Sequence, residues 1–187
     1  EKRKPTVAVF ADDSDPLGMS PMFRSFVAGQ LATLREMTLF YAPNINSYKR
    51  FVEGSFAPTA VAWGLDNRTC AMRVVGHGHG MRVECRAPGG DVNQYLAVSA
   101  LIAGGLYGID NELELEDATE GNAYTSGADQ LPTTLAEAVE LLDNSTVARE
   151  AFGDDVVDHY LNNARVELKA FGAAVTDWER KRGFERL

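Results

Sequence analysis

The sequence predicts an α+β fold, with helices before and after a central group of short strands along the chain. Apolar residues recur at spacings of three and four near both ends of the chain, which is the pattern of helices with one buried face. Between residues 59 and 86, β-branched and aromatic residues form short runs separated by turn residues, which is typical of strands. At 187 residues and 45% hydrophobic composition, the chain is long enough for one globular domain.

Residues 1–19 are the least informative part of the chain. Thr6–Phe10 is predicted to form a short strand and Asp12–Pro16 an acidic turn. A calcium loop is the alternative for these aspartates, but the later glycine and glutamate of that motif are missing at their spacings. Ser20 and Pro21 form a strong helix start, because serine caps free amides and proline suits the first turn. This helix is expected to span residues 21–42.

Strands and turns alternate over the middle of the chain. A turn is expected at Asp66-Asn67, and a glycine loop at Gly76–Gly80. In the last strand, a period of two places Arg82, Glu84 and Arg86 on one face. The expected strands are Thr59–Gly64, Thr69–Val75 and Met81–Arg86.

Helices are expected again after the strands. Asn93–Tyr107 is apolar nearly all round and is followed by Gly108, so a buried helix under the sheet is predicted. Thr134–Glu137 has the spacing of a capping box, and Ser145 can cap a further helix. A long amphipathic helix is expected over residues 154–180.

Charge is unevenly distributed along the chain. Residues 46–86 contain six Lys and Arg against three acidic residues, a net charge of 6 − 3 = +3, whereas residues 87–187 sum to 7 − 19 = −12. Arginine is a planar, permanently charged fork that matches carboxylate and phosphate oxygens. Several arginines on adjoining strands therefore favour an anionic ligand. The alternative is a solvated sheet face with internal salt bridges.

The composition of the whole chain disfavours several classes of protein. A net charge of −9 argues against binding to nucleic acid or anionic membranes, and Lys2–Lys4 is expected to be a solvated end. No apolar run is long enough to span a bilayer and no signal peptide is visible, so we expect a cytoplasmic protein. Cys70 and Cys85 are expected to be small buried thiols, with a disulfide as the alternative.

Several short motifs occur in order along the chain: Asn46-Ser47-Tyr48-Lys49-Arg50, Ala57-Pro58, Asn67-Arg68, Arg73, Glu84-x-Arg86-x-Pro88 and Asn93-x-Tyr95-Leu96. Together they resemble the second half of the catalytic domain of glutamine synthetase, type I branch. The resemblance extends from about Gly18 to the C-terminus. It implies a curved antiparallel sheet with helices packed outside it.

The resemblance also implies an organisation for the whole subunit. Residues 1–187 would be the C-terminal portion of the catalytic domain, with the N-terminal β-grasp domain and the first catalytic half absent, so this part alone is not expected to turn over substrate. Members of the family form homo-oligomeric rings with sites between neighbouring subunits. The closing Gly183–Leu187 resembles the tail that helps to join those subunits.

Five arginines acquire roles from the resemblance. Arg50 and Arg86 match the arginines that hold the glutamate substrate. Arg68 matches the catalytic arginine that contacts the transferring phosphoryl group. Arg73 and Arg82 match arginines on the nucleotide side. These types suit the chemistry because positive charge must gather where phosphate oxygens develop charge.

One acidic residue and two histidines complete the expected site. Glu84 matches a ligand of Mg²⁺ or Mn²⁺, hard cations that prefer oxygen donors. The glycine loop departs from the family, because His77 and His79 stand where a lysine or arginine is common. We interpret this loop as a flexible hairpin tip near the nucleotide, with a metal site as the alternative.

The loop over residues 51–58 matches the family's flap, which carries a glutamate two residues before its proline. Phe56 occupies that position here, and phenylalanine cannot accept a proton, although its ring face can contact a cation. A site without that carboxylate should prefer a larger, partly apolar amine. A packed loop aromatic is the alternative interpretation of Phe56. Tyr124 occupies the position of a tyrosine that is adenylylated in some relatives, but its neighbours Thr125–Gly127 differ, so we interpret it as structural.

The implied activity is ATP-dependent ligation of the glutamate γ-carboxylate to an amine through γ-glutamyl phosphate. Phe56 favours an organic amine such as a polyamine or ethanolamine. One alternative is ordinary glutamine biosynthesis from ammonia. A second alternative is a non-catalytic scaffold of the same fold, against which the retained arginines argue.

Overall fold

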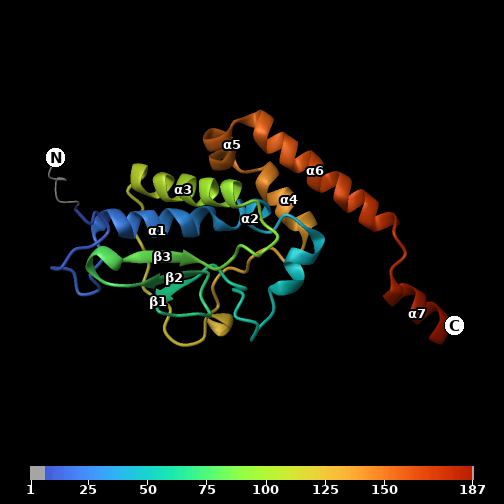
Figure 1. Ribbon diagram of the computed structural model, residues 1–187, viewed down its shortest axis with the longest axis horizontal. Coiled ribbons are helices and arrows are strands. Elements are labelled where there is room, and N and C mark those ends of the chain that lie inside the picture. Colours follow the sequence, from blue (N-terminus) through green and yellow to red (C-terminus); the bar gives the residue numbers. More distant parts are fainter. Residues whose placement is uncertain (1–6, 187) are drawn as a thin grey trace, which may run out of the picture.

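The computed structural model describes residues 7–186 and confirms an α+β arrangement around one small sheet. In Figure 1, α1 (Pro21–Leu34) lies between α3 (Gln94–Asp110) and the strands. Fully buried side chains from α1 and the sheet, such as Phe23 and Met72, belong to one hydrophobic core. The three strands are β1 (Trp63–Leu65), β2 (Met72–Val75) and β3 (Arg82–Cys85).

The sheet is mixed in direction. Strands β2 and β3 pair antiparallel, as expected, with Arg73 opposite Glu84. Strand β1 runs parallel to β2, with Gly64 opposite Arg73, so the expectation of a wholly antiparallel sheet is wrong for this pair. The Asn67 side chain accepts a hydrogen bond from the Thr69 amide (3.0 Å), and this turn folds the chain back before β2 begins. All three strands are shorter than predicted.

Helix α1 starts where the sequence predicts, because Ser20 Oγ accepts a hydrogen bond from the Phe23 amide (3.1 Å). It ends at Leu34 and not at residue 42, and the short helix α2 (Thr38–Tyr41) follows. The Thr38 hydroxyl donates to the Leu34 carbonyl (2.8 Å), and the Thr38 amide donates instead to Arg35 O. The Thr38 amide thus leaves the bonding pattern of a continuous helix, and a turn over residues 35–37 separates α1 from α2.

The N-terminal strand expected at Thr6–Phe10 is not formed over the described residues 7–10, and Thr6 and Lys2–Lys4 lie outside the described part. Only an isolated bridge joins Ala11 to Met19. The acidic turn is confirmed, since the Asp15 amide donates to Asp12 O (3.1 Å).

Helix α3 differs from its prediction in two ways. Asn93 caps it as an N-cap should, but the helix is not fully buried: Tyr95 is 87% exposed and Ile102 48% exposed. Gly108 does not end the helix. It lies inside α3, where its missing side chain allows the helix backbone to touch Gly29 of α1.

Four helices form the C-terminal part, and their caps at Thr134 and Ser145 are confirmed. The long helix expected over residues 154–180 is interrupted at Ala174–Thr176, because Thr176 and Glu179 form a capping box that starts a new helix. Figure 1 shows the last two helices extending away from the body of the molecule. The helices are α4 (Leu135–Asp143), α5 (Thr146–Phe152), α6 (Asp154–Ala173) and α7 (Asp177–Glu185).

Two further sequence expectations can be checked on the described residues. Cys70 and Cys85 are free thiols, and burial raises their pKa values to about 11 and about 12, respectively. Among residues 7–186, no helix has the length and apolar character needed to cross a membrane.

The contact between α1 and α3 predicts the effect of one methyl group. A Cβ added at Gly108 would overlap the Ser25 carbonyl and the Gly29 backbone, so Gly108→Ala should lower the free energy of unfolding by roughly 3 kcal/mol. Gly172→Ala on α6 is the matched control, since nothing lies near its added Cβ, and it should stabilise by roughly 0.5 kcal/mol. Urea denaturation of both variants is the measurement. Equal stabilities would contradict the packing described here.

Candidate active site

Arg50 ends the short 3-10 helix η1 (Ile45–Arg50), which carries the Asn-Ser-Tyr-Lys-Arg motif. One Nη of its guanidinium donates to the Ala87 carbonyl, just beyond β3. Burial lowers the pKa of Arg50 from its usual value. The helix is tied to the same region at its other end, because Ser47 Oγ donates to Asp91 Oδ2 (2.5 Å). Arg50 is therefore fixed against the segment that follows β3.

Glu84 lies between two arginines. Its Oε2 accepts from Arg73 Nη1 (2.8 Å) across the β2–β3 pair, and its Oε1 accepts from Arg86 Nη1 (3.1 Å). The hydrogen bond from Arg73 is the main reason that the pKa of Glu84 lies below its usual value. The predicted shared face of Glu84 and Arg86 is thus confirmed, and one carboxylate is shared by two guanidiniums.

Arg86 also holds the flap. Its Nη2 donates to the Phe56 carbonyl (2.9 Å) and its Nε to the Arg68 carbonyl (3.1 Å). Phe56 has a left-handed φ of +60°, and the residue is 60% exposed. The Tyr124 hydroxyl donates to the Ala57 carbonyl (3.0 Å), which supports the structural interpretation of this tyrosine.

One cavity joins most of the predicted residues. It has a volume of about 330 Å³ and is lined by residues of η1, the flap and β3. Arg50 and Arg86, the arginines expected to hold glutamate, both line it, together with Phe56 and Glu84. A cationic cavity with an aromatic side chain at its edge can bind an anion and offer apolar surface to a second substrate.

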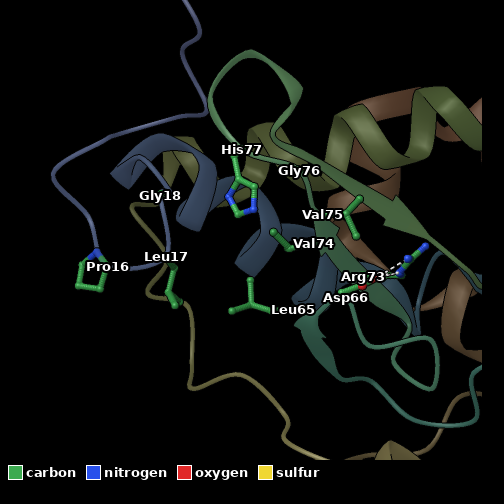
Figure 2. A pocket seen from close by; sticks show the side chains of 10 residues that line it. All are labelled: Pro16, Leu17, Gly18, Leu65, Asp66, Arg73, Val74, Val75, Gly76 and His77. Atoms are coloured by element: carbon green, nitrogen blue, oxygen red, sulfur yellow. Dashed lines mark hydrogen bonds and ion pairs between the residues drawn. The ribbon is translucent and has the colours of Figure 1, made fainter.

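The residues expected on the nucleotide side do not line this cavity. A second cavity has a volume of about 490 Å³, and its lining includes Arg73, Asp66 and His77. Figure 2 shows Arg73 beside Asp66, with His77 farther along the chain beyond β2. Arg68 lines a third cavity beside Asn67, and its side chain is exposed. Arg82 is exposed at the end of the β2–β3 hairpin and donates to Gly80 O (3.0 Å). Neither Arg68 nor Arg82 lines the cavity of about 330 Å³ that Arg50 lines.

The hairpin loop contains the two exposed histidines, and the residues Gly78–Gly80 form a single turn of 3-10 helix. His159 is exposed on α6, away from the cavities described here. No three or more His, Cys, Asp or Glu residues gather into a metal site anywhere in residues 7–186. The metal interpretation of His77 and His79 therefore has no support in the part of the chain that the structure describes.

The carboxylate of Glu84 has some of the properties that a metal ligand needs. Its oxygens suit Mg²⁺ or Mn²⁺, and its side chain is 43% exposed, so a cation could reach it. Both oxygens already accept hydrogen bonds, although a carboxylate has lone pairs for further partners. Glu84 fits as one ligand of such a cation, and the other ligands would have to be substrate oxygens or groups outside residues 7–186.

Two acidic residues of this region were not predicted from the sequence as part of the site. Asp66 accepts a hydrogen bond from Arg73 Nε (2.9 Å), and Asp91 accepts from Ser47 and Asn44. The sequence predicts only a turn at Asp66. Asp66 lies one residue beyond β1, beside the strand that carries Arg73, and this position could have indicated the contact. Placing the two residues side by side depends on the parallel pairing of β1 with β2, which the sequence did not predict.

The comparisons with known proteins agree with these motifs. The family profile described as "Glutamine synthetase, catalytic domain" matches residues 3–183. Gamma-glutamylethanolamide synthetase GlnA4 of Streptomyces coelicolor is 66% identical over 170 residues, which cover 91% of this chain and 37% of that protein. Glutamate–isopropylamine ligase of a Pseudomonas species is 41% identical over 175 residues, covering 91% of this chain and 38% of that protein.

The fold has a counterpart among solved structures. The structure titled "GmaS/ADP complex" superposes with a TM-score of 0.85 at 29% identity, covering 95% of this chain and 42% of that one. The chain thus spans about two fifths of the length of the relatives it matches. Because the profile match covers nearly all of its residues, the chain belongs to the glutamine synthetase family, within the catalytic domain.

Proposed function

We propose that this chain is part of an ATP-dependent ligase that joins the γ-carboxylate of glutamate to an organic amine. The observation that carries the proposal is that Phe56 lines one cavity with Arg50 and Arg86. The two relatives described above act, by their names, on ethanolamine and isopropylamine. Ethanolamine is therefore our first choice of amine, with polyamines as the second.

The reaction we propose has two steps. In the first, a γ-carboxylate oxygen attacks the terminal phosphorus of ATP, ADP leaves, and an acyl phosphate forms. In the second, the amine nitrogen attacks the acyl carbon and phosphate leaves. The amine must have lost a proton before it attacks, because only the neutral amine has a free electron pair.

The arginines have separate roles in this scheme. Arg50 and Arg86 bind the carboxylate groups of glutamate. Their hydrogen bonds to backbone carbonyls orient the two guanidiniums for this role. Arg68 stabilises the charge that develops on the transferring phosphoryl group, and Arg73 and Arg82 contact the nucleotide phosphates. Glu84 would help to hold Mg²⁺ or Mn²⁺, which neutralises phosphate oxygens when bound.

Phe56 acts at the amine. Its exposed ring can cover the carbon atoms of an organic amine, and it has no charge with which to attract ammonium. Glutamine synthesis from ammonia is the second candidate, because several relatives at 34–36% identity carry the name glutamine synthetase.

We propose the wider context that the family implies. Residues 1–187 would be the C-terminal portion of a cytoplasmic subunit and would need the remaining portion for turnover. The subunits would assemble into a homo-oligomeric ring. The exposed Trp178 and Phe184 of α7 are candidates for contacts in that ring.

The first prediction concerns the acceptor. The full-length gene product should release ADP with glutamate, MgATP and ethanolamine, at a kcat/KM about tenfold or more above that for ammonium. Putrescine and spermidine are tested beside them. A higher kcat/KM for ammonium would favour glutamine synthesis as the function. No ADP release with any amine would favour the scaffold interpretation.

A second prediction tests Phe56 directly. Phe56→Glu should lower the ratio of kcat/KM for ethanolamine over ammonium by about tenfold, because a carboxylate attracts ammonium and removes its proton. Val52→Glu is the matched control, since Val52 is exposed in the same loop but does not line the cavity. An unchanged ratio for Phe56→Glu would remove the proposed role of this residue.

A third prediction concerns Arg68. Its side chain is exposed, so Arg68→Ala should leave the denaturation midpoint unchanged, yet it should lower kcat for ADP release by about a hundredfold. Lys49→Ala, which removes an exposed cation next to Arg50, should have little effect on kcat. Full activity of the Arg68 variant would contradict its assignment.

A further inference from the structure

Arg73 and Arg86 share Glu84, but their other contacts are unequal. Besides Glu84, Arg86 donates to two backbone carbonyls, those of Phe56 and Arg68. The other partner of Arg73 is Asp66, whose Oδ1 accepts from Arg73 Nε (2.9 Å) and also from Nη2. Figure 2 shows the Asp66 and Arg73 side chains pointing toward each other beside the second cavity. Among the described residues, Arg73 thus has two carboxylate partners and no carbonyl partner.

This difference matters when a cation binds to Glu84. A divalent ion there would repel both guanidiniums and weaken their hydrogen bonds to the same carboxylate. Arg86 would keep its two carbonyl acceptors, whose positions do not depend on Glu84. Arg73 would keep only Asp66. The carboxylate of Asp66 is therefore the contact that can hold Arg73 in place in the loaded site.

The local backbone does not need this carboxylate. Asp66 has a left-handed φ of +48°, where glycine or asparagine fits at least as well as aspartate. The turn is held by its main chain, because the Asp66 amide donates to the Val74 carbonyl (2.9 Å). The side chain of Asp66 is 76% exposed and buries little surface. Its one strong interaction is with Arg73, which also lowers the pKa of the Asp66 carboxyl below its usual value.

We propose that Asp66 is a positioning residue that keeps Arg73 directed toward the phosphates of the nucleotide when Glu84 binds its metal ion. Asp66 does not itself contact the nucleotide in this scheme, because its charge would repel phosphate. The inference rests on the proposed function for the role of Arg73. Its distinguishing feature is that Asp66 matters most when metal is present.

The test compares Asp66→Asn and Asp66→Gly in the full-length gene product, since both residues accept a left-handed backbone. Binding of a non-hydrolysable ATP analogue is measured by calorimetry with and without magnesium. With magnesium, Asp66→Gly should weaken binding roughly tenfold, and Asp66→Asn should weaken it less, because its amide oxygen can still accept from Arg73. Without magnesium, Glu84 still holds Arg73, and the loss should be about twofold or smaller.

Glu112→Gly is the matched control. Glu112 is also an exposed acidic residue with a left-handed φ, of +50°, so this variant removes the same charge type and relieves the same backbone conformation. Nucleotide binding by Glu112→Gly should equal that of the wild type. The KM for glutamate, measured where the enzyme turns over, should change less than about twofold for every variant, because Arg50 and Arg86 keep their contacts.

Wild-type nucleotide affinity for Asp66→Gly in the presence of magnesium would overturn the proposal. An equal loss with and without magnesium would do the same, because it would show a general structural effect. Failure of the proposed function alone has a different signature, because a wild type that binds the analogue but releases no ADP with any amine still allows the binding comparison. A wild type that does not bind the analogue in the presence of magnesium would overturn the proposal for Asp66 as well.

Discussion

The antiparallel register of β2 and β3 is the constraint on which the candidate site depends. It places Arg73 directly opposite Glu84, and the period of two along β3 places Arg86 on the same face. A slip of one residue would turn every one of these side chains to the other face of the sheet. The buried neighbours Met72 and Val74, which alternate with Arg73 along β2, oppose such a slip because they would leave the hydrophobic core. The apolar pattern of β2 therefore sets the geometry of the charged site.

Arginines connect this sheet to the loops around it. Arg86 donates to the carbonyls of Phe56 and Arg68, and Arg50 donates to Ala87, so each links segments that are far apart in sequence. Such contacts satisfy part of each guanidinium and still leave its positive charge uncompensated, because a carbonyl is neutral. Glu84 and Asp66 compensate only part of the total charge. The result is a group of cations, several of them held by hydrogen bonds, which would suit the carboxylate and polyphosphate ligands of the proposed function.

The sequence predicted which residues would gather in one place better than it predicted the bounds of the helices and strands. Resemblance and strand periodicity together located Arg50, Phe56, Glu84 and Arg86, and all four line one cavity. The errors lie at local features: a turn over residues 35–37 ends α1, and a capping box at Thr176 starts a new helix inside the predicted C-terminal one. The hydrogen bonds of Asp66 and Asp91 join separate segments of the chain, and the periodicity of apolar residues does not predict which segments lie together.

In the proposed function, the main chain and the side chain at position 56 would serve different tasks, the binding of glutamate through Arg86 and the choice of amine. At position 56 the main chain anchors Arg86, whereas the side chain is exposed at the edge of the cavity. A change of side chain there need not move the arginine, because the carbonyl that holds Arg86 is present in every residue type. Under the proposed function, the flap side chain would therefore be the part that varies with the amine, and the cationic residues of the sheet would be the part that stays constant.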